Sequence, residues 1–409
     1  MDKDRLDSKA DFNAVMARDE AISLMEPLLV GPDSRFAGEI NDLIVELAAK
    51  AAGFRRSLPE AMLSSLADLV RAMNCYYSNL IEGHDTHPVD IERALQKEYS
   101  SDTQKRNLQL EARAHIKVQA WIDRGGLSGR ALTIKGIREI HRRFCELLPD
   151  ELLWVEDLDS GERIHIIPGM LREWDVRVGS HIPVSPVALP SFLQRFEQVY
   201  SGLSRSQTIA MAAAAHHRLL WIHPFIDGNG RVTRLMSHAI FLETLDTGGV
   251  WSIARGLARN VGKYKTLLAH CDLSRRNALD GRGNLSEEAL VEFTLFFLKI
   301  CLDQIEFMEN LVQPDRLRHR MLSWAAEEVA MGSLLPKSEL ILEALLYRGL
   351  LPRGEVQNLL GVGERQARRV VSSLTKQKVL NSTSRRAPLS LAFPPRLAPR
   401  WMPGLFPDK

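Results

Sequence analysis

The sequence has few cysteines and no long apolar run. Its four cysteines are far apart, without the close pairing that is typical of metal sites, and they are Cys75, Cys145, Cys271 and Cys301. We therefore expect buried free thiols in a reducing compartment. No apolar stretch approaches the ~20 residues that a membrane-spanning helix needs, and the start, Met-Asp-Lys-Asp-Arg, lacks the apolar core of a signal peptide. These absences predict a cytoplasmic protein that has no membrane partner.

The net charge of the sequence is small, but positive and negative residues are distributed unevenly along the chain. The 409 residues, 45% hydrophobic and 25% charged, suit an ordinary globular chain of two or three domains and exclude extensive disorder. The net charge of +2 combines two unlike parts. Residues 337–409 contain thirteen Lys and Arg against five Asp and Glu, a net charge of +8, and the remainder carries −6. A basic carboxy-terminal part predicts a nucleic-acid partner, and a merely soluble basic tail is the alternative.

Apolar residues recur at helical spacing through most of the chain. The pattern predicts helices at about 40–53, 59–83, 103–123, 133–147, 187–201, 205–221, 229–246, 259–270, 286–312 and 314–331. Strand character is confined to residues 163–167 and 174–178, which flank the turn at Pro168 and predict a short hairpin. The exposed edge of such a hairpin can accept an extended peptide as an extra strand, and a hairpin that only covers the core is the alternative.

The most informative segment is His223-Pro-Phe-Ile-Asp-Gly-Asn-Gly-Arg-Val-Thr-Arg234, where a long helix begins. Backbone N–H groups at a helix N-terminus attract anions, because they lack partners within the helix. Asp227 can hold a Mg²⁺ ion that binds phosphate, and Arg231 and Arg234 offer forked donors to phosphate oxygens. His223 can take a proton from an incoming hydroxyl. The segment therefore predicts a triphosphate site with a base beside it.

This segment resembles the signature His-x-Phe-x-(Asp/Glu)-Gly-Asn-Gly-Arg-x-x-Arg of the Fic family at every specified position. The resemblance implies Mg²⁺-dependent transfer of AMP from ATP to a hydroxyl side chain of a target protein. Carried over by position, His223 deprotonates that hydroxyl, Asp227 holds Mg²⁺, and Phe225 anchors the loop in the core. The residues that would bind the nucleotide phosphates are Gly228, Asn229, Gly230, Arg231 and Arg234. An ordinary helix start is the alternative, but no packing demand requires all these residue types together.

The resemblance also assigns two regions outside the signature. Fic proteins dock the target segment on a hairpin flap, and residues 163–180 are the candidate for that flap. Residues 260–264 correspond to a region near the nucleotide base. Tyr264 is therefore a candidate for stacking on adenine, although an aromatic residue there is at least as often part of the core.

Residues Ser78-Asn-Leu-Ile-Glu-Gly83 resemble the inhibitory pattern (Ser/Thr)-x-x-x-Glu-(Gly/Asn) of the same family. Ser78 and Glu82 are one helical turn apart, on one face. Glu82 falls at the end of a helix, where the macrodipole disfavours a carboxylate by roughly several tenths of a kcal/mol. A cationic partner would compensate this cost, and the family pattern identifies it as Arg234. A paired Arg234 is not available to the terminal phosphate, so the resemblance implies autoinhibition; an exposed Glu at a helix end is the alternative.

The carboxy-terminal part has a pattern of its own. Helical spacing over 340–345 ends at Gly349, a short helix follows over 353–360, and the turn Gly361-Val-Gly363 leads into a third helix over 364–377. Strand-like residues at 379–380 and 389–393 complete the arrangement of a winged helix-turn-helix, with Arg365, Arg368 and Arg369 on the third helix. The region resembles winged helix domains that accompany many bacterial Fic proteins. DNA binding is one expectation, and protein contacts or dimerisation are the other.

Taken together, the sequence predicts an all-α protein with a Fic-type helical core, a small β-hairpin flap and a carboxy-terminal winged helix-turn-helix domain. The expected bounds are 1–100 for an amino-terminal helical region with the inhibitory helix, 101–312 for the catalytic core, 313–334 for a connecting helix and 335–409 for the winged helix domain. The expected function is that of a protein adenylyltransferase autoinhibited by Glu82. Removal of AMP from the same target, and transcription regulation with the core as a nucleotide sensor, are the alternatives. The sequence leaves open whether the chain forms a homodimer.

Overall fold

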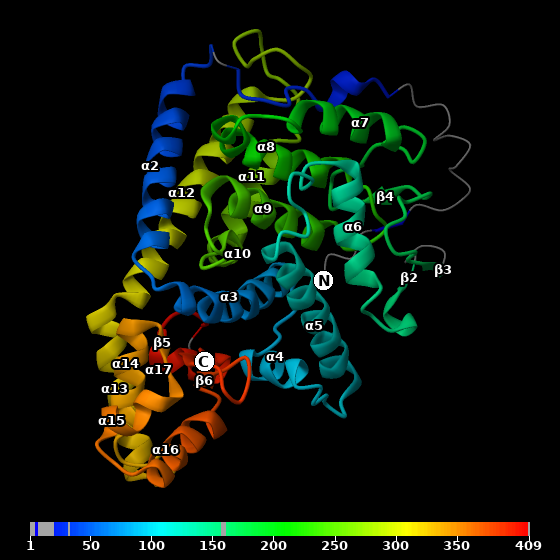
Figure 1. Ribbon diagram of the computed structural model, residues 1–409. Helices are drawn as coiled ribbons and strands as arrows, with labels where there is room; N and C mark the ends of the chain where they lie inside the picture. Colours follow the sequence, from blue (N-terminus) through cyan, green and yellow to red (C-terminus); the bar gives the residue numbers. More distant parts are fainter. Residues whose placement is uncertain (1–4, 7–19, 32, 157–160, 408–409) are drawn as a thin grey trace.

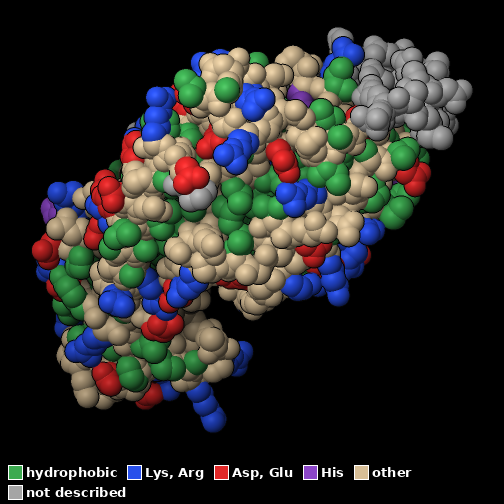
Figure 2. Space-filling view, turned by 90° about the horizontal axis from the view of Figure 1, so that it is seen from above, with side chains coloured by type: hydrophobic (Ala, Val, Ile, Leu, Met, Phe, Trp, Pro, Cys, Tyr) green, Lys and Arg blue, Asp and Glu red, His purple; other side chains and the backbone are tan. Residues whose placement is uncertain are grey.

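The computed structural model describes residues 5–6, 20–31, 33–156 and 161–407, and it is mostly helical with small antiparallel sheets (Figure 1). This confirms the predicted fold class of a helical protein with little strand. Within the described residues no helix is long and apolar enough to cross a membrane. On the face seen in Figure 2, basic and acidic side chains are interspersed with apolar ones.

The amino-terminal part is a series of helices that lead to the core. They are η2 (Ile22–Met25), α2 (Ala37–Arg56), α3 (Glu60–Ile81), α4 (Pro88–Leu95) and α5 (Thr103–Asp123). The bounds of α5 are those predicted, because Asp102 caps its first turn by accepting a hydrogen bond from the backbone N–H of Lys105 at 2.8 Å. Helix α4 was not predicted, since its eight residues are too few for a clear apolar period.

The central part packs helices around α8 and α9. Its helices are α6 (Ile134–Cys145), η3 (Asp150–Leu152), α7 (Leu189–Tyr200), α8 (Arg205–Ile222), α9 (Asn229–Leu245), α10 (Ile253–Arg259), α11 (Val261–His270) and α12 (Glu287–Val312). The buried alanines 212–215 let α8 approach its neighbours closely. Helices α12 and α2 run side by side along the edge of the molecule (Figure 1). The helix predicted at 259–270 is present as α11, and the short helix α10 before it, whose C-cap is Asn260, was not predicted.

The strands of this part pair differently from the predicted hairpin. Strand β2 (Trp154–Glu156) pairs with β3 (Arg163–His165), and β4 (Val176–Arg177) pairs with β1 (Arg5–Leu6). The predicted pairing of 163–167 with 174–178 is therefore wrong. The reason is that the intervening backbone binds the core, because the N–H of Gly169 donates to the His141 ring and the N–H of Arg172 donates to the Pro224 carbonyl.

The carboxy-terminal part follows α12 and lies at the lower left of Figure 1. It contains α13 (Pro314–Ala330), α14 (Ser338–Arg348), β5 (Leu350–Leu351), η4 (Arg353–Glu355), α15 (Val356–Leu360), α16 (Glu364–Lys376), β6 (Leu380–Asn381), β7 (Leu389–Leu391), η5 (Pro395–Leu397) and α17 (Ala398–Trp401). The three strands form one antiparallel sheet in the order β5-β7-β6. Its assignment as a winged helix domain stays a prediction. After α17 the chain returns to α3, where the ring of Phe406 meets Tyr76.

Candidate active site

The signature segment forms the loop between α8 and α9. His223 ends α8 in the left-handed conformation, with φ 53° and ψ 64°, and Gly228 precedes α9 with φ 82°. Two left-handed residues five positions apart reverse the chain sharply, and glycine adopts this conformation without steric cost. The loop therefore places His223 near the beginning of α9, where the unpaired N–H groups of a helix start point outward.

Phe225 and Asn229 hold this loop in one conformation. The side-chain carbonyl of Asn229 accepts from the Phe225 N–H at 2.9 Å, and its amide donates to the Phe225 carbonyl at 2.8 Å. The ring of Phe225 is fully buried and stacks on the His141 ring, with centroids 4.0 Å apart. Phe225 thus anchors the loop, as the resemblance implied. The side chain of Asn229 thus braces the loop, and its backbone lies at the helix start, in the turn that was expected to bind an anion.

His223 is buried, and its ring is held by a backbone carbonyl. Its Nδ1 lies 3.3 Å from the carbonyl oxygen of Leu220. Because a carbonyl only accepts hydrogen bonds, Nδ1 is the donor in this contact. The backbone carbonyl of His223 accepts from Nε of Arg172 at 2.7 Å. The buried Arg172 is a structural support that sequence analysis missed, because the flap candidate 163–180 was assigned as a whole, without a role for this residue.

Asp227 is exposed in the same loop, beside a neutral histidine. Burial lowers the pKa of His141 to about 4, although the nearby Asp227 carboxylate acts in the opposite direction. Nδ1 of His141 accepts from the N–H of Gly169 at 2.9 Å. His141 therefore ties the segment after β3 to the signature loop without adding a charge near Asp227.

Arg234 is held by the last turn of α3. Its Nε donates to the Ser78 hydroxyl at 2.8 Å, and its Nη2 donates to Glu82 and to the Ser78 carbonyl. Burial raises the pKa of Glu82, but the Arg234 and Arg231 guanidinium groups outweigh it, so the pKa lies below its usual value. Ser78 and Glu82 precede Arg234 by 156 and 152 positions, and the structure brings all three together. These are the residues that the sequence pattern had assigned to one inhibitory contact.

Two glycines make this contact possible. Gly83, with φ 84°, lets the chain leave α3 directly after Glu82. At Gly230, a Cβ atom would lie only 2.4 Å from a carboxylate oxygen of Glu82. The carboxylate therefore lies directly against the start of α9, where the phosphates are expected.

Arg231 has a different partner. Its Nη2 donates to the Glu111 carboxylate at 2.6 Å, and its guanidinium carbon lies 5.1 Å from the centre of the Phe144 ring. The Arg231 side chain is 9% exposed, so it is largely enclosed. Sequence analysis missed Glu111, because it lies 120 residues earlier and outside any recognised pattern. Both signature arginines are therefore paired with carboxylates in this structure.

Tyr264 is a core residue, which corrects its expected role in stacking on adenine. The residue is 2% exposed, and its hydroxyl lies 2.7 Å from Nε2 of His216. A ring enclosed in this way offers no face to a nucleotide. His216 and His217 are both buried as well, so neither is a surface residue; His217 contacts Asp272 at 3.0 Å.

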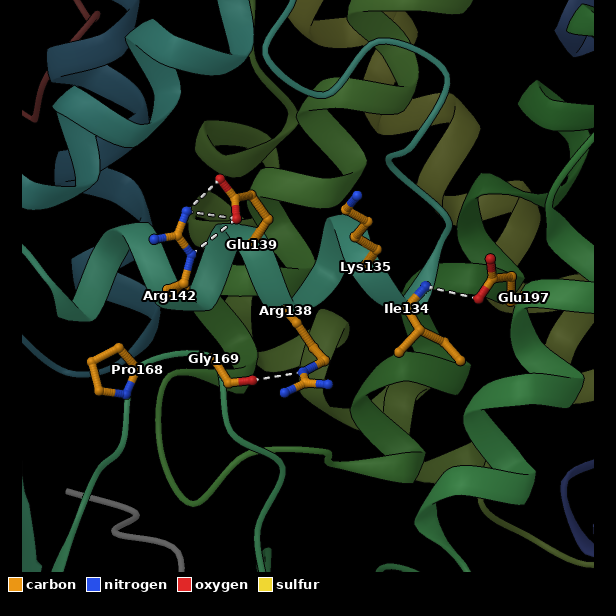
Figure 3. Close-up of a pocket in the computed structure, with 8 residues that line it drawn as sticks. All are labelled: Ile134, Lys135, Arg138, Glu139, Arg142, Pro168, Gly169 and Glu197. Carbon is orange, nitrogen blue, oxygen red and sulfur yellow. Dashed lines mark hydrogen bonds and ion pairs between the residues drawn. The ribbon is translucent and has the colours of Figure 1, made fainter.

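A cavity of about 450 Å³ opens between α6 and the segment after β3 (Figure 3). Arg138 reaches across it to donate to the Gly169 carbonyl at 2.7 Å, and Arg142 pairs with Glu139 on the same helix. Its lining consists of Ile134, Lys135, Arg138, Glu139, Arg142, Pro168, Gly169 and Glu197. The residues predicted from the signature are not among these, and Gly169 of the lining donates a hydrogen bond to His141, which stacks on Phe225 of the signature loop.

Comparison with known proteins agrees with this geometry. Residues 131–241 match the model of the Fic/DOC family. The chain is 28% identical over 237 residues to the protein adenylyltransferase Fic of Drosophila ananassae, covering 58% of this chain and 42% of that protein. It is 37% identical over 113 residues to the protein of the same name from Drosophila erecta, covering 27% of this chain and 20% of the relative. The chain thus spans less than half the length of these curated relatives.

Two solved structures are also similar. One is a Fic family protein from Desulfovibrio desulfuricans, with a TM-score of 0.48 and 14% identity, covering 86% of this chain and 96% of that one. The other is a Fic domain containing signaling protein from Bacteroides thetaiotaomicron, with a TM-score of 0.48 and 20% identity, covering 65% of this chain and 95% of that one. The family match thus identifies residues 131–241 as the part of this chain that is similar to the Fic/DOC family.

Proposed function

We propose that this chain is a protein adenylyltransferase, which moves AMP from ATP to a hydroxyl side chain of a target protein and is autoinhibited by Glu82. One observation carries the proposal: His223, whose Nδ1 contacts the Leu220 carbonyl, lies in the loop that leads to a helix start bearing two arginines. The curated relatives named above, which carry the name protein adenylyltransferase, support it.

The chemistry follows from these groups. His223 Nε2 takes the proton of the target hydroxyl, whose oxygen attacks the α-phosphorus of ATP. A bond forms between that oxygen and phosphorus, the bond to the β-phosphate breaks, and pyrophosphate leaves. The N–H groups at the start of α9, with Arg231 and Arg234, stabilise the charge on the phosphates.

Asp227 fits a Mg²⁺ ion that arrives with the nucleotide. Mg²⁺ is usually bound by one or two carboxylates together with substrate phosphates and water. Asp227 is exposed at the loop, and the described residues contain no group of three or more His, Cys, Asp or Glu that could hold a metal by themselves. When bound, Mg²⁺ would neutralise phosphate charge, and Asp227 is the residue that would hold it.

The Glu82–Arg234 contact is the proposed autoinhibition. It occupies the Arg234 guanidinium and places a carboxylate against the start of α9. A triphosphate would lack the Arg234 guanidinium as a hydrogen-bond donor, and the Glu82 carboxylate would repel it. It would therefore bind in a pose unfit for transfer. The Glu82 side chain is 36% exposed, which leaves room for it to move away.

The target protein is proposed to dock on the flap region, residues 163–180. Strand β3 pairs on one side with β2, and its other edge is unpaired within the described part of the chain. That edge can accept an extended segment by strand addition, which would bring a hydroxyl toward His223.

DNA binding by the carboxy-terminal part is a second proposal, favoured by the faces of α16. Ala367, Val370 and Leu374 are buried, whereas Arg365, Arg368 and Arg369 are exposed. Electrophoretic shifts at increasing salt, with and without alanine at Arg368 and Arg369, test it. A binding constant indifferent to salt would contradict phosphate contacts.

Mass spectrometry after incubation with ATP and Mg²⁺ tests the main proposal. The parent chain should gain little AMP, and the Glu82→Gly variant should gain AMP on Ser, Thr or Tyr of itself and of candidate targets. Glu60→Gly, in the exposed first turn of the same helix, is the control and should behave as the parent. Phosphate or uridylyl adducts, or no adduct in the Glu82 variant despite ATP binding, would contradict the proposal.

A further inference from the structure

The two signature arginines receive their carboxylate partners from places of different rigidity. Glu111, the partner of Arg231, lies within the 21-residue helix α5, whereas Glu82 caps the end of α3. A residue inside a long helix is fixed by backbone hydrogen bonds on both sides. A helix end followed by a glycine with φ 84°, as at Gly83, can rearrange locally. Arg234 thus has a releasable counterion, and Arg231 has a permanent one.

The surroundings of Arg231 explain why it needs a permanent counterion. Its side chain is 9% exposed and lies between Glu111 on α5 and Phe144 on α6. Burial alone would lower the pKa of Arg231, but the Glu111 carboxylate, followed by Asp227 and Glu82, raises it, so the group stays cationic. An enclosed cation without its carboxylate is strongly unfavourable, and the side chain would have to leave its position. This requirement holds whether or not Glu82 is in place.

The hydrogen bonds distinguish a support from a second inhibitor. A guanidinium group has five N–H donors. Arg234 donates through Nε to the Ser78 hydroxyl and through Nη2 to Glu82 and the Ser78 carbonyl. Arg231 donates through Nη2 to Glu111, and its buried Nε has no hydrogen-bond partner among the described residues. Glu111 therefore holds Arg231 from one side and leaves donors for an incoming anion.

We propose that Glu111 is a positioning residue for nucleotide binding: it fixes Arg231 beside the start of α9, so that the remaining donors of this arginine can bind the phosphates of ATP. The inference rests on the proposed function, which identifies ATP as the anion. It adds that nucleotide binding at the start of α9 depends on two carboxylates with opposite effects. Glu82 withholds one arginine from the nucleotide, and Glu111 keeps the other in place.

The test compares Glu111→Gln and Glu111→Ala in the Glu82→Gly background, where Arg234 is released. Gln keeps a hydrogen-bond acceptor and loses the charge, and Ala loses both. Glu92→Gln is the matched control, since Glu92 is a similarly enclosed carboxylate, 12% exposed, that pairs with Arg396 on η5. Calorimetry measures the affinity for ATP with Mg²⁺, and self-modification rates give kcat and KM separately.

We expect about tenfold weaker ATP binding with Ala and a smaller loss with Gln, because a charge-assisted contact is stronger than a neutral one. The loss should appear as a higher KM for ATP, and Glu92→Gln should show none. In an Arg231→Ala background, Glu111→Gln should cause no further loss, which a merely structural role would not produce.

Unchanged affinity in Glu111→Gln and Glu111→Ala would overturn the inference. Tighter ATP binding in either would overturn it too, and would make Glu111 a second inhibitory group. Because ATP affinity and transfer are two separate readouts, a chain that binds ATP in this Glu111-dependent way but modifies nothing would contradict the proposed function and support the role of Glu111.

Discussion

The hydroxyl of Tyr77 donates a hydrogen bond to the backbone carbonyl of Leu405 at 3.0 Å, and both groups are buried. Tyr77 directly precedes Ser78, whose hydroxyl binds Arg234. The neighbouring Tyr76 meets the ring of Phe406 edge-on, with centroids 5.6 Å apart. The segment after α17 therefore packs on the same turns of α3 that place Glu82, and it supports the Glu82–Arg234 contact (Figure 1).

Phe406→Ala should weaken both the fold and the inhibition. Phe406 is 6% exposed, and truncation of a buried Phe to Ala costs roughly 3–5 kcal/mol of unfolding free energy. Because the end of α3 loses packing, transfer should rise, though less than with Glu82→Gly. Denaturant unfolding and incorporation of labelled ATP measure the two effects. Arg400→Ala is the control, because this half-exposed side chain on α17 pairs with Glu327 on α13. Lower stability without any change in transfer would limit the segment to a structural role.

Ser78→Ala should relieve inhibition in part. The substitution leaves the enclosed Nε of Arg234 without its acceptor, which costs about 1–3 kcal/mol of folding free energy. The ion pair with Glu82 stays, so the transfer rate should fall between those of the parent chain and of Glu82→Gly. Rates of self-modification by the three proteins, at equal ATP concentration, measure this order. A Ser78→Ala rate equal to that of the parent would show that Glu82 alone holds Arg234.

The sequence predicted those features that depend on residues close together in the chain. The bounds of α5 follow from its apolar spacing and from Asp102 at its start, and the signature loop follows from residues within twelve positions of each other. The Ser78–Glu82 turn could be matched to Arg234 only because the pattern is already known in the family. Spacing alone showed that Glu82 needs a cation, and it did not show which one.

Contacts between distant segments could not be predicted in this way. The residues near 163–178 have strand character, but their pairing depends on Gly169 and Arg172, whose N–H groups bind His141 and Pro224. Glu111 has no local feature that separates it from any other helical Glu. Tyr264 is at a position that suits either a stacking surface or the core, and its hydrogen bond to His216, 48 residues away, fixes it in the core.

The stabilising effect of Glu82 should disappear only in acid. The net effect of burial, which raises the pKa of Glu82, and of Arg234, which lowers it, is a pKa below the usual 4.5. A carboxylate with a lowered pKa stabilises the folded state above its unfolded pKa, and this contribution is lost as the pH falls through the folded pKa. The difference in unfolding free energy between the parent and Glu82→Gln should therefore be constant from pH 7 to about pH 5 and shrink below 4.5. A difference that shrinks between pH 7 and pH 6 would point to a histidine instead.

His223→Asn should abolish transfer without disturbing the site. Alanine is a poorer test, because residue 223 has φ 53°, and Asn tolerates the left-handed conformation better than Ala does. The Asn amide can also donate to the Leu220 carbonyl, which the ring now does through Nδ1. Loss of a general base costs about 10²- to 10⁴-fold in rate. We expect a fall of this size in the Glu82→Gly background, with ATP affinity unchanged in calorimetry and unfolding free energy within about 1 kcal/mol of the parent. Transfer that persists at the rate of Glu82→Gly would remove His223 from the role of base and leave the proton to another group.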